Sequence, residues 1–288
     1  MIPAQFDYQV ANTLEEAITI LAKDPDGSKV LAGGHSLIPA MKLRLAQPQL
    51  LVDIARIKSL SYIREEGDRV LIGATTTHYE IQSSDLLKRI CPLLPECAAS
   101  IGDVQVRNKG TIGGSLAHSD PAGDWPAAAI SLGADLVVVG NEGERVIRAD
   151  DFFVDLLTTA LQPGEILREI RIVKPQGRFG QTYQKVPHPA SGFAVVGVAM
   201  SLVLAADGSC ESAGVGITGV ATKAYRARAV ETALAGNRLD EQTIASAASH
   251  VCDGVEPNSD LYASGEYRCH LAQVHTRRAI QTASGRAK

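Results

Sequence analysis

The sequence has no excess of either charge and few of the largest side chains. Its 288 residues include 28 Lys and Arg against 32 Asp and Glu, a formal net charge of −4. A nucleic-acid groove normally needs a clustered basic face, so this balance argues against nucleic-acid binding. Trp occurs once and Met three times, while 45% of the residues are hydrophobic. These proportions exclude a disordered chain and are typical of a soluble globular protein.

Targeting and membrane-spanning segments are also missing from the pattern. The first residues, MIPAQFDYQVANTLEEA, contain neither a charged n-region nor an apolar h-region, so we expect no secretory signal and a cytoplasmic protein. The longest nearly apolar stretch, 192–206, is shorter than the ~20 residues that span a bilayer. It ends at a turn-forming Asp-Gly-Ser, 207–209. This stretch is therefore predicted to be a strand of a hairpin.

Cysteine spacing gives no sign of a metal or cluster site. The five cysteines are scattered, and they are Cys91, Cys97, Cys210, Cys252 and Cys269. Zinc knuckles favour two cysteines separated by two residues, and an iron–sulfur cluster needs four thiolates. We therefore expect free thiols of a cytoplasmic protein and no metal centre in this chain.

The length corresponds to about two domains, and we place their boundary near residue 176. Thr13 and Glu16 form a predicted capping box, in which Glu16 reaches back to Thr13. Strands predicted at 29–32 and 50–54 are expected to run parallel within a compact α/β subdomain, 1–55. The remaining expected elements are strands at 70–74, 135–139, 194–205 and 210–219, and helices at 79–88, 92–101, 127–132, 224–235, 240–252 and 265–283.

Glycine is abundant, with 26 residues, and two pairs of consecutive glycines stand out. They lie in the segments 32–37 (AGGHSL) and 111–116 (TIGGSL). Glycine permits close approach and positive φ, so successive backbone N–H groups can converge on one anion. Two such loops on separate subdomains could clasp a pyrophosphate. The sequence has neither a P-loop motif nor a Rossmann fingerprint, and on residues alone the glycine pairs could equally be plain turns.

The wider context of these loops carries a specific resemblance. Segments 32–54 (AGGHSLIPAMKLRLAQPQLLVDI) and 106–127 (VRNKGTIGGSLAHSDPAGDWPA) resemble the two flavin-binding signatures of the medium subunits of aerobic, molybdenum-containing carbon monoxide dehydrogenases. Those subunits belong to the xanthine dehydrogenase family of molybdenum hydroxylases. The resemblance continues through 160–165 (ALQPGE) and 183–185 (YQK), so it covers nearly the whole chain.

The resemblance implies an α+β fold. It consists of a two-subdomain FAD-binding domain of the vanillyl-alcohol oxidase type, residues 1–176, with subdomains 1–55 and 56–176. A C-terminal α+β domain, 177–288, follows with a small antiparallel sheet and helices. FAD is expected to bind non-covalently.

The implied function is that of an electron-transfer subunit of an oxidoreductase. The complex would also contain a large molybdopterin subunit and a small subunit with [2Fe–2S] clusters. Electrons would pass from these clusters to FAD in this chain and then to an external acceptor. The implied assembly is a dimer of heterotrimers, and peripheral membrane association through the acceptor is compatible with it. The alternatives are a free-standing FAD-dependent oxidase or reductase and an assembly module without flavin. The substrate, whether carbon monoxide, a purine, an N-heterocycle or an aldehyde, cannot be read from this chain.

By the same resemblance, both glycine segments contact the FAD diphosphate and its flanking groups. The residues so assigned are Ala32, Gly33, Gly34, His35, Ser36, Leu37, Ile38, Gly110, Thr111, Gly113, Gly114 and Ser115. Neither a catalytic acid–base residue nor a metal ligand is expected in this chain.

Further positions are expected to surround the rest of the cofactor. Ile101 and Gly102 are assigned to the adenosine half, and Asp124 to ribose or ribityl hydroxyls. Leu161 is expected to pack on a ring. His118 is expected either to touch the cofactor or to serve the structure.

The flavin ring itself is expected to have one cation and one aromatic residue nearby. Lys185 is the charged side chain placed there, because a cation stabilises the anionic reduced ring. Relatives commonly continue with a basic run and an Asp–aromatic pair, whereas this chain has VPHPASGF at 186–193. Phe193 could still supply the aromatic.

Overall fold

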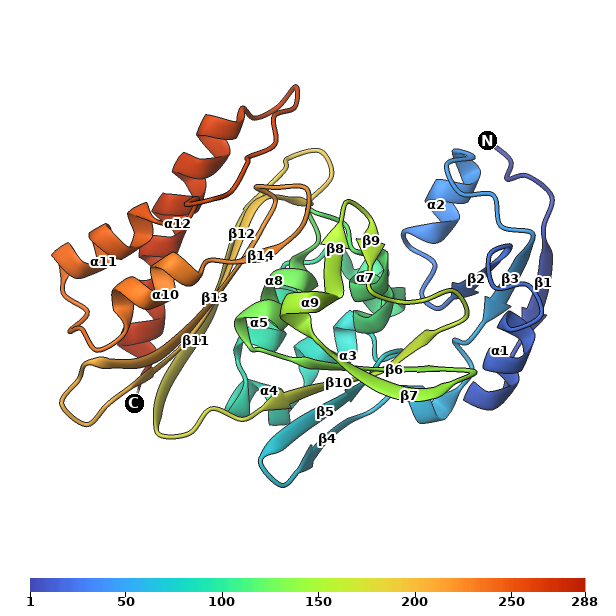
Figure 1. Cartoon of the computed structure of the whole chain (residues 1–288), viewed down its shortest axis with the longest axis horizontal. Helices are drawn as coiled ribbons and strands as arrows, with labels where there is room; N and C mark the ends of the chain where they lie inside the picture. Colours follow the sequence, from blue (N-terminus) through green and yellow to red (C-terminus); the bar gives the residue numbers. More distant parts are fainter. Residues whose placement is uncertain (288) are drawn as a thin grey trace.

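A computed structural model describes residues 1–287 and shows three units in chain order along its long axis. In Figure 1 the first unit (blue) lies on the right, the second (cyan to green) in the centre, and the third (orange to red) on the left. The mixed helix and sheet content agrees with the expected α+β class.

The first unit is a three-stranded parallel sheet with two helices. Its elements are β1 (Asp7–Val10), α1 (Leu14–Leu21), β2 (Ser28–Leu31), α2 (Leu37–Lys42) and β3 (Leu50–Asp53). The order is β1-β3-β2, and both neighbours run parallel to β3. The expected parallel pair is therefore confirmed, while the largely exposed β1 was not predicted.

The predicted cap of α1 is only half right. The Thr13 side chain accepts the backbone N–H of Glu16 at 3.1 Å, as expected. The Glu16 carboxylate, however, accepts the backbone N–H of Asn12 at 2.8 Å instead of reaching Thr13. The helix then buries Ala17, Ile20 and Leu21 against the sheet.

The second unit is built on a five-stranded antiparallel sheet of order β4-β5-β10-β6-β7. Its helices and strands are η1 (Lys58–Leu60), β4 (Ile63–Glu66), β5 (Arg69–Gly73), α3 (His78–Ser83), α4 (Asp85–Ile90), α5 (Leu93–Ala99), α6 (Val104–Lys109), α7 (Ile112–His118), α8 (Asp124–Ser131), β6 (Asp135–Gly140), β7 (Gly143–Arg148), α9 (Ala149–Phe152), β8 (Phe153–Asp155), β9 (Thr158–Thr159) and β10 (Ile166–Val173). The central strand, β10, buries Ile166, Leu167, Ile170 and Ile172, yet the sequence pattern did not predict it.

The third unit is a four-stranded antiparallel sheet covered by helices. It comprises β11 (Arg178–Pro187), β12 (Ala194–Leu204), β13 (Cys210–Thr218), β14 (Tyr225–Arg226), α10 (Arg228–Leu234), α11 (Glu241–Ser249) and α12 (Gly265–Arg286). The predicted hairpin is confirmed as β12 and β13. The second and third units are in direct contact, because Ser131 of α8 donates its hydroxyl to the Gly214 carbonyl of β13 at 2.8 Å.

The buried side of α12 agrees only in part with the amphipathic pattern of the sequence, which puts Tyr267, Leu271, Val274 and Ile280 on one side. Ile280 is fully buried, whereas Tyr267 is 48% exposed. Small residues such as Ala272, Thr276 and Ala283 are also buried. The helix lies so close to β11 that a β-carbon on Gly180 would stand 1.8 Å from the Ala283 carbonyl oxygen, which leaves no room for large side chains.

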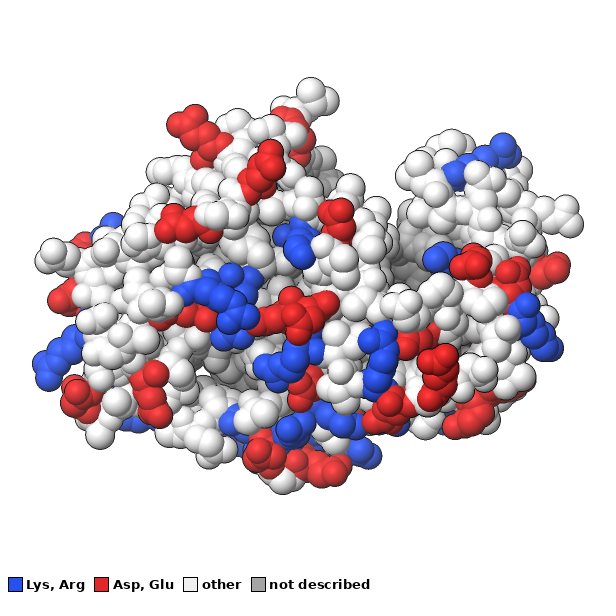
Figure 2. All heavy atoms as spheres, in the orientation of Figure 1, with Lys and Arg blue, Asp and Glu red and all other residues white. Residues whose placement is uncertain are grey.

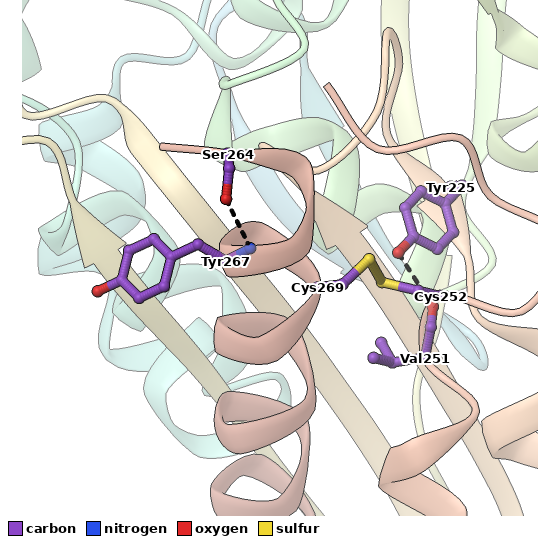
Figure 3. The surroundings of a disulfide bond; sticks show 6 residues. All are labelled: Tyr225, Val251, Cys252, Ser264, Tyr267 and Cys269. Carbon is purple, nitrogen blue, oxygen red and sulfur yellow. Dashed lines mark hydrogen bonds between the residues drawn. A yellow bond between two sulfur atoms is a disulfide. The ribbon is translucent and has the colours of Figure 1, made fainter. Parts of the chain in front are cut away.

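A disulfide joins two of the cysteines that were expected to be free thiols. Cys252 follows α11 and Cys269 lies in the first turns of α12, with their Cα atoms 6.0 Å apart (Figure 3). The prediction was wrong for this pair, because packing of the helices brings together residues whose spacing in sequence matches no motif. Cys91, Cys97 and Cys210 are free and buried. Within residues 1–287, no helix is long and apolar enough to cross a membrane.

Candidate functional site

The two glycine segments meet at direct backbone contact. A β-carbon on Gly33 would stand 2.2 Å from the carbonyl oxygen of Lys109 and 2.9 Å from the Cα of Gly110. Gly34 has a φ of +74°, a conformation that favours glycine. Only glycine at position 33 therefore lets the first subdomain approach the second so closely.

The first segment presents backbone donors without protein partners. Within residues 1–287, the N–H groups of His35, Ser36 and Leu37 donate to no protein acceptor. Ser36 precedes α2 but makes no capping bond with its side chain. Unpartnered N–H groups in a glycine-containing turn are well suited to binding an anion.

The second segment is built differently from the expectation. Its glycines lie in the first turn of α7, where Thr111 caps the helix and accepts the Gly114 N–H at 3.1 Å. The Gly113 N–H donates to the Ala74 carbonyl at 2.8 Å. A β-carbon on Gly113 would stand 2.5 Å from that of Ala74. Gly113 therefore permits close packing, and its N–H and that of Gly114 are already used within the protein.

Gly114 has a separate role, because it leaves bare backbone at the surface. It is exposed, and a β-carbon there would meet no atom within 4 Å except the Thr111 hydroxyl oxygen, at 2.8 Å.

Figure 2 shows the surface hollowed between the part that carries α2 and the part that carries β8 and β9. Basic and acidic side chains lie side by side over the face shown in Figure 2.

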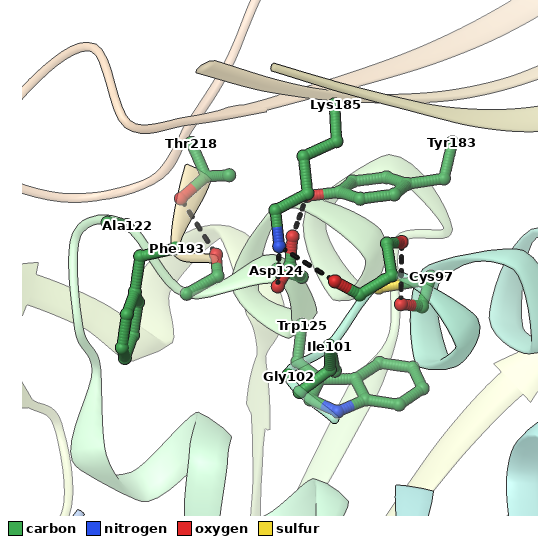
Figure 4. A network of polar contacts seen from close by, with 12 residues as sticks. Cys97, Ile101, Gly102, Ala122, Asp124, Trp125, Tyr183, Lys185, Phe193 and Thr218 are labelled. Atoms are coloured by element: carbon green, nitrogen blue, oxygen red, sulfur yellow. Dashed lines mark hydrogen bonds and ion pairs between the residues drawn. The ribbon is translucent and has the colours of Figure 1, made fainter. Parts of the chain in front are cut away.

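A buried ion pair lies where the third unit meets the second. Lys185 of β11 donates to the Asp124 carboxylate at 2.9 Å and to the Ser100 carbonyl at 2.9 Å. Tyr183 donates its hydroxyl to the other Asp124 oxygen at 2.6 Å. Burial raises the pKa of Asp124, although Lys185 and Tyr183 oppose this by stabilising the charged form. Figure 4 shows Lys185 and Tyr183 both directed at Asp124.

This pair gives Lys185 and Asp124 partners within the protein. Their expected contacts with the isoalloxazine and with ribose or ribityl hydroxyls stay predictions. Lys185 also holds the Ser100 carbonyl, which directly precedes Ile101 and Gly102. The carbonyls of Ile101 and Gly102 accept hydrogen bonds from the Arg107 guanidinium at 3.0 and 2.8 Å. The positions expected near the adenosine half are thus held from both sides.

The other candidate residues lie around this region. Phe193 follows the 188–192 loop, and its side chain is 46% exposed. Leu161 is partly buried against the core of the second unit. His118 lies 3.9 Å from the Asp120 carboxylate. Their predicted contacts with the cofactor are open to experiment.

His78 is a buried residue at this site that the sequence reasoning did not assign to it. It begins α3, is 4% exposed, and its backbone N–H donates to the Gly110 carbonyl at 3.0 Å. Its spacing from other histidines gave no signal, because its partners are Gly110, which follows α6, and Trp125 of α8. Among residues 1–287, no three His, Cys, Asp or Glu side chains gather in a way that could hold a metal ion.

Comparison with known families defines the class of protein. Residues 4–175 match the family described as the FAD binding domain in molybdopterin dehydrogenase, and residues 181–283 match the CO dehydrogenase flavoprotein C-terminal domain. The chain is therefore an FAD-binding flavoprotein of the molybdopterin dehydrogenase class.

Individual relatives narrow this class. The carbon monoxide dehydrogenase medium chain of Afipia carboxidovorans is 39% identical over 100% of both chains. The glyceraldehyde dehydrogenase medium chain of Sulfolobus acidocaldarius is 35% identical over 98% of this chain and 99% of that one. A solved carbon monoxide dehydrogenase structure from Hydrogenophaga pseudoflava superposes with a TM-score of 0.97 at 38% identity, covering 100% of both chains. The chain belongs to this family of FAD-binding medium subunits of molybdenum hydroxylases, and the fold and family expected by resemblance are confirmed.

Proposed function

We propose that this chain is the FAD-binding, electron-transferring medium subunit of a heteromeric molybdenum hydroxylase. The observation that carries the proposal is the contact between Gly33 and the Lys109–Gly110 backbone. It places the unpartnered N–H groups of His35, Ser36 and Leu37 beside the second glycine segment, in a chain whose residues 4–175 match an FAD-binding family.

The residues present fit the cofactor. Backbone donors at 35–37 suit the FAD diphosphate, and the uncovered backbone of Gly114 leaves room that a side chain would fill. The bound flavin supplies two-electron redox chemistry that can also proceed one electron at a time. The chain's own residues would bind and orient the cofactor. Lys185 holds the Ser100 carbonyl and Arg107 holds the carbonyls of Ile101 and Gly102, which fixes the backbone expected near the adenosine half.

The remaining details extend the resemblance to partners and location. Relatives bear subunit names such as nicotine 6-hydroxylase medium subunit and caffeine dehydrogenase subunit beta. By analogy, a small [2Fe–2S] subunit would deliver electrons to this chain, and a large molybdopterin subunit would oxidise the substrate. The same proposal includes assembly as a dimer of heterotrimers, a cytoplasmic location and membrane contact through the electron acceptor. It also includes a boundary near residue 176 between the FAD-binding domain and the C-terminal domain.

The test starts from the untagged protein in its native host. Its absorption spectrum is recorded, and the polypeptides that co-purify are identified. Flavin together with one large and one small partner supports the proposal. Flavin without partners favours a free-standing flavoenzyme, and the absence of both overturns the proposal.

A matched pair of glycine variants tests the cradle itself. Gly114→Val places side-chain atoms on the exposed backbone at the start of α7, so we expect it to lose FAD. Gly285→Val is the control, because Gly285 has no neighbour within 4 Å and lies in α12. Stoichiometric FAD in both variants would refute the assignment of the second segment.

A further inference from the structure

His78 lies at the junction of the two glycine segments. Thr77, which precedes it, forms an isolated bridge with Thr111, and the His78 backbone N–H donates to the Gly110 carbonyl at 3.0 Å. A β-carbon on Gly110 would stand 2.6 Å from Nε2 of the His78 ring. The Cα of Gly110 also borders Gly33. One bare glycine thus separates the imidazole from the first segment.

Trp125 determines which ring nitrogen of His78 carries the proton. Its indole Nε1–H can only donate, and it lies 3.0 Å from Nδ1 of His78. Nδ1 therefore accepts, and in the neutral ring the proton sits on Nε2. Within residues 1–287, Nε2 makes no hydrogen bond to a protein acceptor. His78 as a whole is 4% exposed, but its Nε2 is not closed off from the surface, so this donor is free to bind a ligand.

The surroundings keep this ring neutral and favour a negative ligand. Burial is the largest cause that lowers the pKa of His78 to about 4, and electrostatic repulsion from the nearby His35 and Arg107 side chains contributes to the shift. Around pH 7 the ring is therefore an uncharged donor. The neighbouring Arg107 guanidinium also creates a positive potential at the ring, which attracts an anion.

We propose that Nε2–H of His78 binds an oxygen of the FAD diphosphate, with Trp125 as the positioning residue that holds the donor tautomer. The proposal rests on the proposed function, since it names a further ligand-binding side chain of that cofactor site. It adds a side-chain donor to the backbone donors at His35, Ser36 and Leu37, because both His78 and Gly33 approach Gly110. Nε2 is accessible from outside the fold and lies next to the bare backbone of Gly110, so an oxygen of a bound cofactor can reach it.

The first test compares variants of the full chain freed of cofactor and titrated with FAD and with riboflavin, which lacks the diphosphate. His78→Leu removes the donor, so we expect about 10- to 100-fold weaker FAD binding and unchanged riboflavin binding. His78→Gln keeps one donor and one acceptor, so FAD affinity is expected to stay within about 3-fold of the unmodified chain. Trp125→Phe frees the tautomer and should give an intermediate loss.

The second test does not depend on whether His78→Leu folds. The unmodified chain is labelled with ¹⁵N in its histidine rings, and the His78 signals are assigned by comparison with His78→Gln. Saturating FAD is expected to shift the Nε2–H proton signal downfield, and riboflavin is expected to leave it in place.

The outcomes separate the two proposals. If the unmodified chain binds no FAD, the proposed function itself fails. If it binds FAD while the Nε2 signal stays in place, or while His78→Leu binds FAD as tightly as before, the assignment of His78 is overturned and the flavoprotein function stands.

Discussion

Lys185 and Asp124 form an ion pair of 2.9 Å in which both side chains are almost completely buried, 6% and 5% exposed. The two residues come from different units, β11 and α8. The pair therefore links the third unit to the helix that follows the second glycine segment. Removing one partner of a buried pair leaves an uncompensated charge, which costs far more than the intact pair contributes.

Replacing Lys185 by Met should destabilise the protein by about 3–5 kcal/mol. The measurement is chemical unfolding of the purified chain. Asp124→Asn combined with Lys185→Met removes both charges, and we expect it to be more stable than Lys185→Met alone. If the separate losses of Lys185→Met and of Asp124→Asn add up to the loss of the double variant, the two charges are not coupled.

Gly33→Ala should separate the two subdomains, because the new β-carbon would stand 2.2 Å from the Lys109 carbonyl oxygen. This neighbour is backbone, which cannot move aside as a flexible side chain does. We expect loss of bound FAD with little change in the C-terminal unit, measured as the flavin-to-protein absorbance ratio. Gly285→Ala, at an open position, serves as the control and should retain FAD.

The Cys252–Cys269 disulfide closes a loop of sequence separation 17. A loop of this length stabilises by about 3 kcal/mol in the chain-entropy account. Cys252→Ser should lower the unfolding free energy by that amount, and a reductant should lower it equally in the unmodified chain. Thiol labelling followed by mass spectrometry checks the bond itself. An unmodified chain that labels at both positions without reductant would contradict the pairing.

His78 should make stability depend on pH in a defined window. Its pKa is lowered from 6.5 to about 4 in the folded chain, so the unfolded chain binds the proton first as pH falls. Folding is therefore favoured fully above about pH 6.5, and this contribution is lost progressively down to about pH 4, up to about 3 kcal/mol. Unfolding measured across this range in the unmodified chain and in His78→Gln should differ in slope. Parallel curves would remove His78 as the cause.

Local patterns in the sequence were informative where the physics is local. The Thr13 cap depends on atoms three residues apart, and the β12–β13 hairpin depends on its short turn. The glycine pairs were recognisable for a related reason, since a close approach to backbone requires the absence of a side chain. The family resemblance then supplied the cofactor, which no single short pattern could identify.

Other features could not be predicted from the sequence, because the residues that they contact lie far away in the chain. The central strand β10 pairs with β5 and β6, which both precede it and are separated by several helices. The face of α12 that packs on β11 is made mainly of small residues, because the backbone of β11 at Gly180 leaves little space for large ones. Contacts of this kind follow from packing and leave little periodic signal.

The sequence by itself determined the family, the two glycine segments and the alternation of helices and strands. These depend on residue type and short-range geometry. Only the tertiary structure decided that Gly33 touches the Lys109–Gly110 backbone, that Lys185 faces Asp124, that Cys252 meets Cys269, and that Trp125 fixes the His78 tautomer. The physical reason is that hydrogen bonds, ion pairs and disulfides act over a few ångströms, and only the folded chain brings such distant residues within that range.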